Sequence, residues 1–323
     1  MLIVTGGAGF LGSAVIWKFN EMGFDNILVV DNLGTSEKWR NLVNRRFAEY
    51  LHKDEFLERI RREKNHFGAS AVVHMGACSS TTELDAGYLM ENNTHFTMEL
   101  ARDCLESDIR LVNASSAATY GDGSQGFADD AAQLERLKPM NMYGYSKHLF
   151  DLAAKRQGFL GNIASLKFFN VFGPNEYHKG EMRSVACKAF GQIKKTGKVR
   201  LFKSHRPDYA DGGQLRDFVY VKDCAAVVAW LVEHPEACGL FNVGSGKARS
   251  FLDLVRPVFA ALGLPESIEY VDMPEAIRDT YQYYTEAPMD RLRKVGYDRE
   301  FTPLETAVGD YAVNYLAGGD RYL

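Results

Sequence analysis

The chain has 323 residues, of which 46% are apolar and 25% are charged, so it is long enough for one large domain or two moderate ones. Its formal net charge of −4 and its pI near 6.1 exclude a broad basic surface for nucleic acid or anionic lipid. The longest wholly apolar run, Cys224 to Val232, is far shorter than the roughly 20 residues that span a bilayer, so we expect no membrane-spanning helix.

The first half of the chain alternates short β-branched runs with longer helical stretches, which is the βαβ pattern of a parallel sheet. Strands are predicted at residues 2–5, 27–31, 71–74, 111–115 and 163–169, and helices at residues 10–22, 54–62, 84–106 and 142–156. The predicted strands are nearly all apolar, as strands covered by helices on both faces should be. The pattern therefore predicts an α/β fold with a Rossmann-type doubly wound parallel sheet.

The regular alternation of predicted strands and helices ends after Asn170. Gly173-Pro174 interrupts the pattern, and residues 206–213 (RPDYADGG) form a polar insertion rich in turn residues. A strand at 216–221, a helix at about 223–233 and a strand at 240–243 are predicted beyond the insertion. We predict a Rossmann domain made of residues 1–170 with about 217–245, and a smaller, interleaved substrate-binding domain made of about 171–216 and 246–323.

A glycine-rich loop follows the first predicted strand and opens the first predicted helix. Gly6, Gly9 and Gly12 give the spacing GxxGxxG, which allows a tight turn and lets the backbone approach a pyrophosphate at the helix N-terminus. Asp31 ends the second predicted strand about 20 residues further on, as in dinucleotide-binding units. The sequence therefore predicts dinucleotide binding.

The choice between NAD and NADP stays open at this point. Asp31 can hold the ribose 2′-hydroxyl of NAD and would then repel the 2′-phosphate of NADP. Lys38 and Lys53 lie just beyond Asp31 in the sequence and can supply positive charge for that phosphate. The alternative is that both lysines are solvated surface residues.

A YxxxK motif, Tyr143 to Lys147, lies near the start of a predicted helix, and its spacing places both side chains on one helical face. A lysine ammonium close to a phenol stabilises the phenolate and lowers the pKa of the tyrosine. Such a tyrosine can take a hydroxyl proton while hydride leaves for a nicotinamide cofactor. Tyr145 is the rival tyrosine, but no lysine follows it four residues later.

A serine-containing turn, residues 114–121 (ASSAATYG), follows a predicted strand that ends at the expected ligand crevice. A serine hydroxyl there can hydrogen-bond the reacting oxygen, or it can satisfy the backbone of its own turn. Together with FNVFGP at 169–174, RDFV at 216–219 and FNVG at 241–244, these motifs resemble the extended short-chain dehydrogenase/reductase superfamily. The resemblance implies that Ser116, Tyr143 and Lys147 form the catalytic triad of that superfamily.

More specific segments resemble the ADP-L-glycero-D-manno-heptose 6-epimerase family. They are HMGACSSTTE at 74–83, HKG at 178–180, DNL at 31–33 followed by Lys38 and Lys53, NN at 92–93 and YQ at 281–282. The resemblance implies an NADP-dependent isomerase of carbohydrate metabolism that inverts C6″ of ADP-D-glycero-D-manno-heptose by transient oxidation, for lipopolysaccharide core synthesis. It also implies a homo-oligomer, and a pentamer is suggested by the resemblance alone.

The same resemblance implies roles for individual residues. Tyr143 and Lys179 would form the acid/base pair, because a keto sugar that presents each face in turn needs proton-transferring groups able to serve both faces. The alternative for Lys179 is a loop lysine that binds diphosphate. The residues implied to line the cofactor are Gly6, Gly9, Phe10, Leu11, Gly12, Asp31, Asn32, Lys38, Lys53, Met75, Gly76, Ala77, Cys78, Ser79, Asn92, Lys147 and Val171. Those implied to touch the substrate are Ser116, Asn170, Phe202, Arg216 and Tyr281, and Glu181 and Lys188 stand where the family has a small hydroxyl and a histidine.

Three other functions remain open. A 4,6-dehydratase of this superfamily usually carries an acidic pair in the serine turn, and residues 117–120 (AATY) hold no carboxylate, which argues against elimination. A UDP-hexose 4-epimerase is harder to exclude, and Lys179 with the Cys78 segment is the discriminating feature. A non-catalytic NADP-binding regulator is the third possibility, but such proteins often lose the tyrosine or lysine of YxxxK, and both are present here.

The spacing of the cysteines and the N-terminal residues indicate the cellular compartment and whether a metal site is expected. The five cysteines are odd in number, scattered and never in a CxxC pair, which is typical of a reducing compartment. Neither they nor the eight histidines have the paired spacing of a structural zinc site, so no metal is expected. Met1 to Thr5 carries no basic n-region or cleavage site, which favours a cytoplasmic protein.

Overall fold

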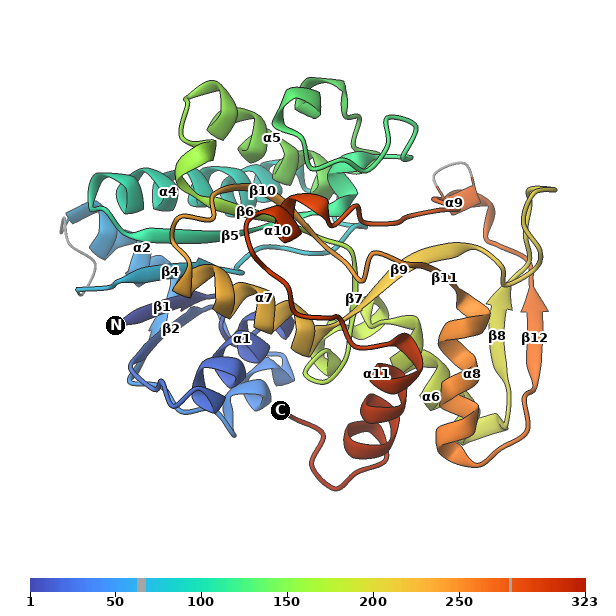
Figure 1. Ribbon diagram of the computed structural model, residues 1–323. Coiled ribbons are helices and arrows are strands. Elements are labelled where there is room, and N and C mark those ends of the chain that lie inside the picture. The colour runs from blue at the N-terminus through green and yellow to red at the C-terminus, as the bar shows by residue number, and fades with distance from the viewer. Residues whose placement is uncertain (63–67, 279–280) are drawn as a thin grey trace.

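The computed structural model describes residues 1–62, 68–278 and 281–323 (Figure 1). Its largest sheet has seven strands, all of them paired in parallel. In spatial order they are β10 (Gly239–Val243), β6 (Ala164–Phe168), β5 (Arg110–Ser116), β4 (Ala71–His74), β1 (Leu2–Thr5), β2 (Ile27–Asp31) and β3 (Glu49–His52). Because the chain order reverses between β1 and β4, a crevice is expected at their carboxyl ends. The predicted doubly wound parallel sheet is confirmed.

Alternate residues of each central strand belong to opposite layers of the core. Leu2 and Val4 of β1 join one buried apolar cluster, whereas Ile3 between them joins the other. The strand β2 divides in the same way, with Val29 in the first cluster and Val30 in the second. Since side chains alternate across a strand, uninterrupted apolar runs of this kind require helices on both faces of the sheet.

The helices cover the two faces as Figure 1 shows, with α1 and α7 on one face and α2, α4 and α5 on the other. Their bounds are α1 (Phe10–Glu21), α2 (Lys53–Arg62), α4 (Phe96–Glu106), α5 (Met142–Arg156) and α7 (Val221–Glu233). The predicted bounds of α5 are those observed, and α1, α2 and α7 each differ from prediction by one or two residues. Asn141 caps α5 by accepting a hydrogen bond from the Gly144 backbone, which fixes where this helix begins.

The single helix predicted at 84–106 is wrong in detail. The segment begins as a short helix, α3 (Ala86–Leu89), passes through a π-helical turn, Met90–His95, and continues as α4. The turn places two adjacent residues against α5, because Asn93 Nδ2 donates to Ser146 Oγ at 3.0 Å and Thr94 Oγ1 donates to the Ser146 carbonyl at 2.8 Å. Single π turns within α-helices are frequently found at functional sites.

The smaller part of the chain is built beyond β6, and Figure 1 shows it beside the carboxyl ends of the large sheet. One small sheet has the order β11 (Ala248–Ser250), β9 (Leu215–Tyr220) and β7 (Asn170–Phe172), and the other pairs β12 (Ile268–Val271) with β8 (Val199–Phe202). The helices are α6 (Val185–Thr196), α8 (Phe251–Leu262), α9 (Glu275–Arg278), α10 (Asp290–Lys294), α11 (Leu304–Asp310) and a π-helical segment, Tyr311–Leu316. The return of the chain through α7 and β10 to the large sheet interleaves the two parts.

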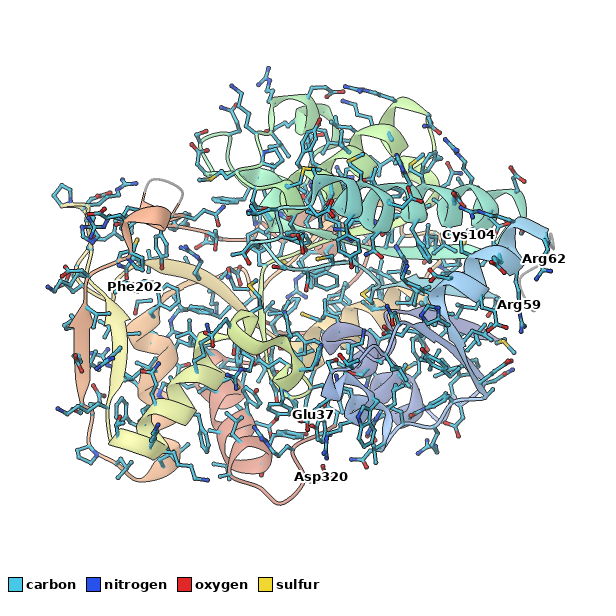
Figure 2. All side chains as sticks on the ribbon, turned by 180° about the vertical axis from the view of Figure 1, so that it is seen from behind. Glu37, Arg59, Arg62, Cys104, Phe202 and Asp320 are labelled. Atoms are coloured by element: carbon cyan, nitrogen blue, oxygen red, sulfur yellow. The ribbon has the colours of Figure 1, made fainter. Side chains whose placement is uncertain are left out.

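The polar insertion is a loop, as predicted, and it follows β8 on the side of the molecule away from α2. Figure 2 shows Phe202, the last residue of β8, at the opposite end of the molecule from Arg59 and Arg62. Over the residues that the structure describes, no helix is long and apolar enough to cross a membrane.

Candidate active site

A cleft of about 800 Å³ opens at the carboxyl ends of the parallel strands. Thr5 of β1, Asp31 of β2, Ser115 of β5 and Phe168 of β6 all line it at or next to their strand ends. Phe251 of α8 lines it from the smaller part of the molecule. The cleft therefore lies where ligands bind in open α/β sheets, at the point where the strand order reverses.

The backbone of the glycine loop is free to contact a ligand, because the loop has no room for side chains. Gly6 has a φ of +65°, and a Cβ there would lie 2.5 Å from the Gly76 backbone nitrogen. Gly9 is the N-cap of α1 and, lacking a side chain, gives the first turn no side-chain cap. The first backbone N–H groups of α1 are thus left for another acceptor. A dinucleotide pyrophosphate suits this cradle, because the helix N-terminus favours negative charge.

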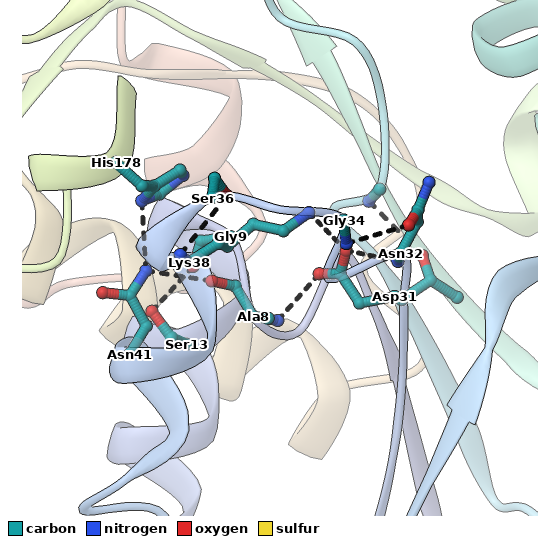
Figure 3. A network of polar contacts seen from close by, with 12 residues as sticks. Ala8, Gly9, Ser13, Asp31, Asn32, Gly34, Ser36, Lys38, Asn41 and His178 are labelled. Carbon is teal, nitrogen blue, oxygen red and sulfur yellow. Dashed lines mark hydrogen bonds and ion pairs between the residues drawn. The ribbon is translucent and has the colours of Figure 1, made fainter. Parts of the chain in front are cut away.

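Asp31 anchors the glycine loop and also pairs with Lys38 (Figure 3). Its Oδ2 accepts a hydrogen bond from the Ala8 backbone at 2.8 Å, and its Oδ1 lies 2.6 Å from Lys38 Nζ. Oδ1 also accepts from the Asn32 backbone at 2.7 Å. Lys53 lines the same cleft at the start of α2, and its Nζ lies 2.9 Å from Asp54. The negative charge of Asp31 is therefore neutralised at the end of β2.

Asn41 joins the glycine loop to the segment that carries Lys179. Its Nδ2 donates to the carbonyls of Ala8 at 2.9 Å and Asn175 at 3.0 Å, and Figure 3 shows it beside His178. Asn175 is fully buried and its own Nδ2 donates to Ser13 Oγ of α1 at 2.9 Å. The two asparagines hold the loop before Lys179 against the dinucleotide cradle.

The wall formed by Met75, Gly76, Ala77 and Ser79 is held by Asn93. Asn93 Oδ1 accepts from the Cys78 backbone at 2.9 Å, and Asn93 Nδ2 donates to the Cys78 carbonyl at 3.0 Å. All four wall residues line the cleft together with Asn92, whereas Cys78 does not.

Tyr143, Ser116 and Lys147 come together in the cleft as the motifs predict. Burial raises the pKa of the Tyr143 phenol, and a hydrogen bond with Ser116 opposes that rise. Lys147 Nζ donates to the Ala114 carbonyl at 2.7 Å, and burial lowers the pKa of Lys147 to about 8. Burial is the largest influence on the pKa of Tyr143. The effect of Lys147 on the phenol therefore stays a prediction.

Lys179 lines the same cleft from the short 3₁₀ segment Tyr177–Met182. Its Nζ lies 5.3 Å from the centre of the Phe10 ring, at the start of α1. Burial lowers the pKa of Lys179, and the nearby Glu176 carboxylate opposes that shift. Glu176 is itself buried and accepts a hydrogen bond from Ser184 Oγ at 2.7 Å, so the acid that faces Lys179 is fixed in place. Lys179 and Tyr143 therefore line one cleft, Tyr143 from α5 and Lys179 from the segment Tyr177–Met182.

A buried charged pair holds α5 against the strands beneath it. Lys167 Nζ of β6 lies 3.0 Å from Asp151 Oδ2 of α5, and neither side chain is exposed. Asp151 also accepts from Ser115 Oγ at 2.7 Å and from Ser165 Oγ at 2.9 Å. Asp151 lies one turn beyond Lys147 on α5, and its charge opposes the effect of burial on the pKa of Lys147.

His74 at the end of β4 links the first strand to α4. Its Nδ1 lies 2.6 Å from Thr5 Oγ1, and its Nε2 lies 2.9 Å from Thr97 Oγ1. Its ring stacks on Phe96 with centroids 5.5 Å apart. Burial lowers the pKa of His74 to about 3, so the imidazole is neutral and structural.

The expected substrate residues divide between the cleft and its surroundings. Asn170 lines the cleft, as does Val171, which was expected on the cofactor. Arg216 is buried, donates to the Leu215 carbonyl at 2.8 Å and to the Gln282 carbonyl, and has no ion pair within the described residues. Its guanidinium carbon lies 5.0 Å from the centre of the Tyr281 ring, and that ring contacts Phe202 at 6.3 Å.

Glu181 and Lys188 pair with each other, with 3.5 Å between Oε2 and Nζ. The Glu181 side chain is 94% exposed, and neither residue lines the cleft. The structure therefore does not bring Glu181 and Lys188, both expected on the substrate, into the cleft.

Several lining residues gave no signal in the sequence. Tyr88, His178 and Phe251 line the cleft, but no motif or periodicity singled out Tyr88 or Phe251, and His178 was noted only as part of a resembling segment. In the described parts of the chain, no group of three or more His, Cys, Asp or Glu side chains is arranged to hold a metal ion.

Comparison with known proteins identifies relatives of this chain. Residues 2–244 match the model of the NAD dependent epimerase/dehydratase family. The ADP-L-glycero-D-manno-heptose-6-epimerase of Nitratidesulfovibrio vulgaris (strain DP4) is 60% identical over 323 residues, and that of Fusobacterium nucleatum subsp. nucleatum is 46% identical over 332 residues. Both alignments cover 100% of each chain. The crystal structure of the Helicobacter pylori ADP-L-glycero-D-manno-heptose-6-epimerase matches with a TM-score of 0.78 at 25% identity, over 96% of this chain and 94% of that chain.

Proposed function

The chain belongs to the NAD dependent epimerase/dehydratase family, and from this premise we propose that it converts ADP-D-glycero-D-manno-heptose to ADP-L-glycero-D-manno-heptose by inverting C6″. The observation that carries the proposal is one cleft whose lining holds the glycine loop together with Tyr143 and Lys179. The resemblance predicted from the motifs is confirmed by the full-length relatives.

We propose a division of labour between the two parts of the chain. Residues 1–170 with about 217–245 hold the cofactor, and about 171–216 and 246–323 hold the sugar nucleotide. The cradle at the N-terminus of α1 supports the first assignment. The buried cation Arg216, whose guanidinium carbon lies 5.8 Å from the ring of the lining residue Phe251, supports the second.

The family is NAD dependent, and within it we propose NADP for this chain. Lys38 neutralises Asp31 at 2.6 Å, so the carboxylate that would repel a 2′-phosphate is already paired. Lys53 adds a second cation to the same part of the cleft. A bound nicotinamide dinucleotide would accept hydride from C6″ and return it to the opposite face of the keto sugar.

We assign the proton transfers to Tyr143 and Lys179. One of them takes the proton of the C6″ hydroxyl as hydride leaves, and the other returns a proton to the oxygen after the ketone has turned over. Ser116 hydrogen-bonds the Tyr143 phenol and orients it toward the reacting oxygen. Burial lowers the pKa of Lys179, which makes its ammonium a better proton donor than an exposed lysine.

Arg216 is the proposed ligand of the substrate diphosphate. It is buried and lacks a carboxylate partner within the described residues, so a diphosphate would supply the missing negative charge. Asn170, Phe202 and Tyr281 would complete the substrate contacts, whereas Glu181 and Lys188 pair with each other outside the cleft lining.

The deciding experiment is NMR of the purified protein with ADP-D-glycero-D-manno-heptose and no added cofactor. The expected result is the C6″ epimer, which would also show that the cofactor stays bound during purification. Absence of the epimer even with added NADP would overturn the heptose assignment. UDP-hexoses would then be tested for 4-epimerisation, and a protein that turns over no sugar nucleotide would be assigned as a regulator.

We also propose that the protein works as a cytoplasmic homo-oligomer. The proposal is supported by the family resemblance and by five cysteines that are all free. Light scattering of the purified chain measures the assembly directly, and a monomeric mass would overturn it.

A further inference from the structure

After α11 the chain returns toward α1, as Figure 1 shows, and residues 320–323 lie against the segment that carries Lys179. We call these four residues the clamp segment. Tyr177 Oη donates a hydrogen bond to the Arg321 carbonyl at 2.7 Å. The Arg321 guanidinium carbon lies 4.3 Å from the centre of the Tyr177 ring, and the Tyr322 ring meets that ring edge-on with centroids 5.4 Å apart. The clamp segment therefore covers Tyr177, two residues before Lys179.

Leu323 ties the clamp segment to the start of the same turn. Its backbone N–H donates to Asn175 Oδ1 at 3.0 Å, and its carbonyl accepts from Arg45. Leu323 and Asn175 are both buried, so the bond between them is shielded from water. Asn175 Nδ2 donates to Ser13 Oγ of α1 at 2.9 Å, so both ends of the Asn175 amide are engaged. The start of the turn that leads to Lys179 is therefore fixed between α1 and the clamp segment.

This turn depends on outside contacts because its backbone is irregular. Gly173, Asn175 and Gly180 have φ values of +138°, +78° and +54°, so no regular ladder of hydrogen bonds extends through it. The Lys179 backbone N–H donates to the Glu176 carbonyl at 3.0 Å, within the turn itself. A segment with few ladder hydrogen bonds opens locally at a low free energy unless its side chains hold it.

A small movement of the turn would displace the Lys179 amine. Lys179 Nζ lies 5.3 Å from the centre of the Phe10 ring, so its place depends on how the turn packs against α1. Misplacing a reacting group by about 1 Å can lower a rate about 10²-fold. Neither Arg321 nor Tyr322 lines the cleft, so their influence on the reaction has to pass through the turn.

We propose that the clamp segment positions Lys179 for proton transfer, with Arg321 and Tyr322 acting through the ring of Tyr177. The inference rests on the proposed function, which gives Lys179 its part in the reaction. Arg321 and Tyr322 are positioning residues and touch no reacting atom. They hold the turn in the place from which the Lys179 amine serves the C6″ oxygen.

The test compares a double variant, Arg321→Ala with Tyr322→Ala, to the unaltered full-length protein, both saturated with NADP⁺. Steady-state kinetics with ADP-D-glycero-D-manno-heptose should show kcat lowered about tenfold and KM unchanged. In a Lys179→Met background the same double change should lower kcat no further, because its effect passes through Lys179. The conservative pair Arg321→Lys with Tyr322→Phe keeps a cation and a ring over Tyr177 and should recover most of the loss.

Arg293→Ala with Phe301→Ala is the matched control. The Arg293 guanidinium carbon lies 5.8 Å from the centre of the Tyr297 ring, and Phe301 contacts that ring with centroids 6.0 Å apart. The control thus removes a like cation and ring outside the cleft lining, and it should change neither constant. Thermal melting of each variant ensures that the kinetics are measured on folded protein. An equal kcat for the two double variants, a raised KM with an unchanged kcat, or a further loss in the Lys179→Met background would each overturn the inference.

Hydrogen exchange followed by mass spectrometry separates this inference from the proposed function. The Lys179 amide, bonded to the Glu176 carbonyl, should exchange faster in Arg321→Ala with Tyr322→Ala than in the unaltered protein, whatever reaction is catalysed. If the unaltered protein epimerises no ADP-heptose, the proposed function fails, and unchanged exchange of the Lys179 amide would overturn the positioning as well. A protein that epimerises ADP-heptose with the same kcat in both double variants keeps the function and loses the positioning.

Discussion

Lys38 and Asp31 form an ion pair of 2.6 Å at the end of β2, where a dinucleotide ribose is expected (Figure 3). The same Asp31 carboxylate accepts the Ala8 backbone N–H from the glycine loop. Asp31 therefore stabilises the conformation of the glycine loop, and Lys38 neutralises the negative charge that Asp31 would otherwise present to a ligand.

Lys38→Ala is expected to shift cofactor preference from NADP toward NAD. The variant loses a cation for the 2′-phosphate and leaves Asp31 without its partner, so NADP⁺ should bind about 10- to 100-fold more weakly. Titration of cofactor-free protein with both dinucleotides measures the change. Lys198→Ala, an exposed lysine away from the cleft, is the control. Equal affinity of Lys38→Ala and the control for NADP⁺ would contradict the assignment.

Tyr143→Phe should lower kcat by about 10²- to 10⁴-fold, the usual contribution of a positioned acid or base. Cofactor binding should be retained, because the ring stays in place and only the hydroxyl is lost. Tyr145→Phe is the matched control on the same helix, since Tyr145 is 44% exposed. Biological activity unchanged by the loss of the Tyr143 hydroxyl would favour a regulator over an enzyme.

Lys179→Met separates proton transfer from diphosphate binding. If Lys179 transfers a proton, kcat falls about 10²-fold or more while KM changes little. If Lys179 binds diphosphate instead, KM rises and kcat changes less. Lys195→Met, an exposed lysine on α6, should change neither constant. Steady-state kinetics with ADP-D-glycero-D-manno-heptose distinguishes the two results.

The buried Asp151–Lys167 pair should be strongly coupled. Asp151→Asn leaves Lys167 charged and unpaired, and is expected to lower the free energy of unfolding by about 3–5 kcal/mol. Adding Lys167→Met removes that charge, so the double variant should lose less than the sum of the single losses. Urea denaturation measures all three variants. Glu135→Gln, which breaks the exposed pair between Glu135 of the 3₁₀ segment Ala131–Arg136 and Lys155 of α5, should cost no more than about 1 kcal/mol.

His74 should make the fold sensitive to acid. Its folded pKa of about 3 lies below the ordinary 6.5, so the unfolded chain binds a proton that the folded chain does not as pH falls through 6.5. The contribution of His74 to the free energy of unfolding is therefore fully present above pH 6.5 and is lost as the pH falls below it. The loss amounts to about 2 kcal/mol at pH 5.

The variant His74→Gln should reduce the difference in unfolding free energy between pH 7.5 and pH 5 by that amount. Phe96→Leu is the control, because it removes the ring stacked on His74 and keeps the imidazole. It should lower stability at both values of pH by similar amounts. A pH dependence of His74→Gln identical to that of the unaltered protein would remove His74 as the cause.

The large sheet was predictable because its central strands are buried on both faces. The strand β2 was predicted with its observed bounds since every one of its residues is buried. The strand β3 was missed because it lies at the sheet edge and only Leu51 of its residues is buried, so no apolar run marks it. The break in the predicted helix at 84–106 was missed because a π turn changes the periodicity without adding glycine or proline.

The site was predictable where a local motif dictates local geometry. Gly6, Tyr143 and Lys147 act within short segments whose spacing is visible in the sequence. The contact of Asn41 with Asn175 joins residues 134 apart, and the Leu323 backbone donates to Asn175 from 148 residues away. Such contacts depend on the assembled fold, so no spacing rule could have indicated them.

The π-helical turn Met90–His95 limits how this region can change in evolution. Each residue of a helix turns it by about 100°, so deleting one residue from the turn would rotate all of α4 by that angle. Thr97 would then move away from His74, while Asn93 and Thr94 remained against Ser146. Related sequences should therefore show substitutions in this stretch far more often than insertions or deletions.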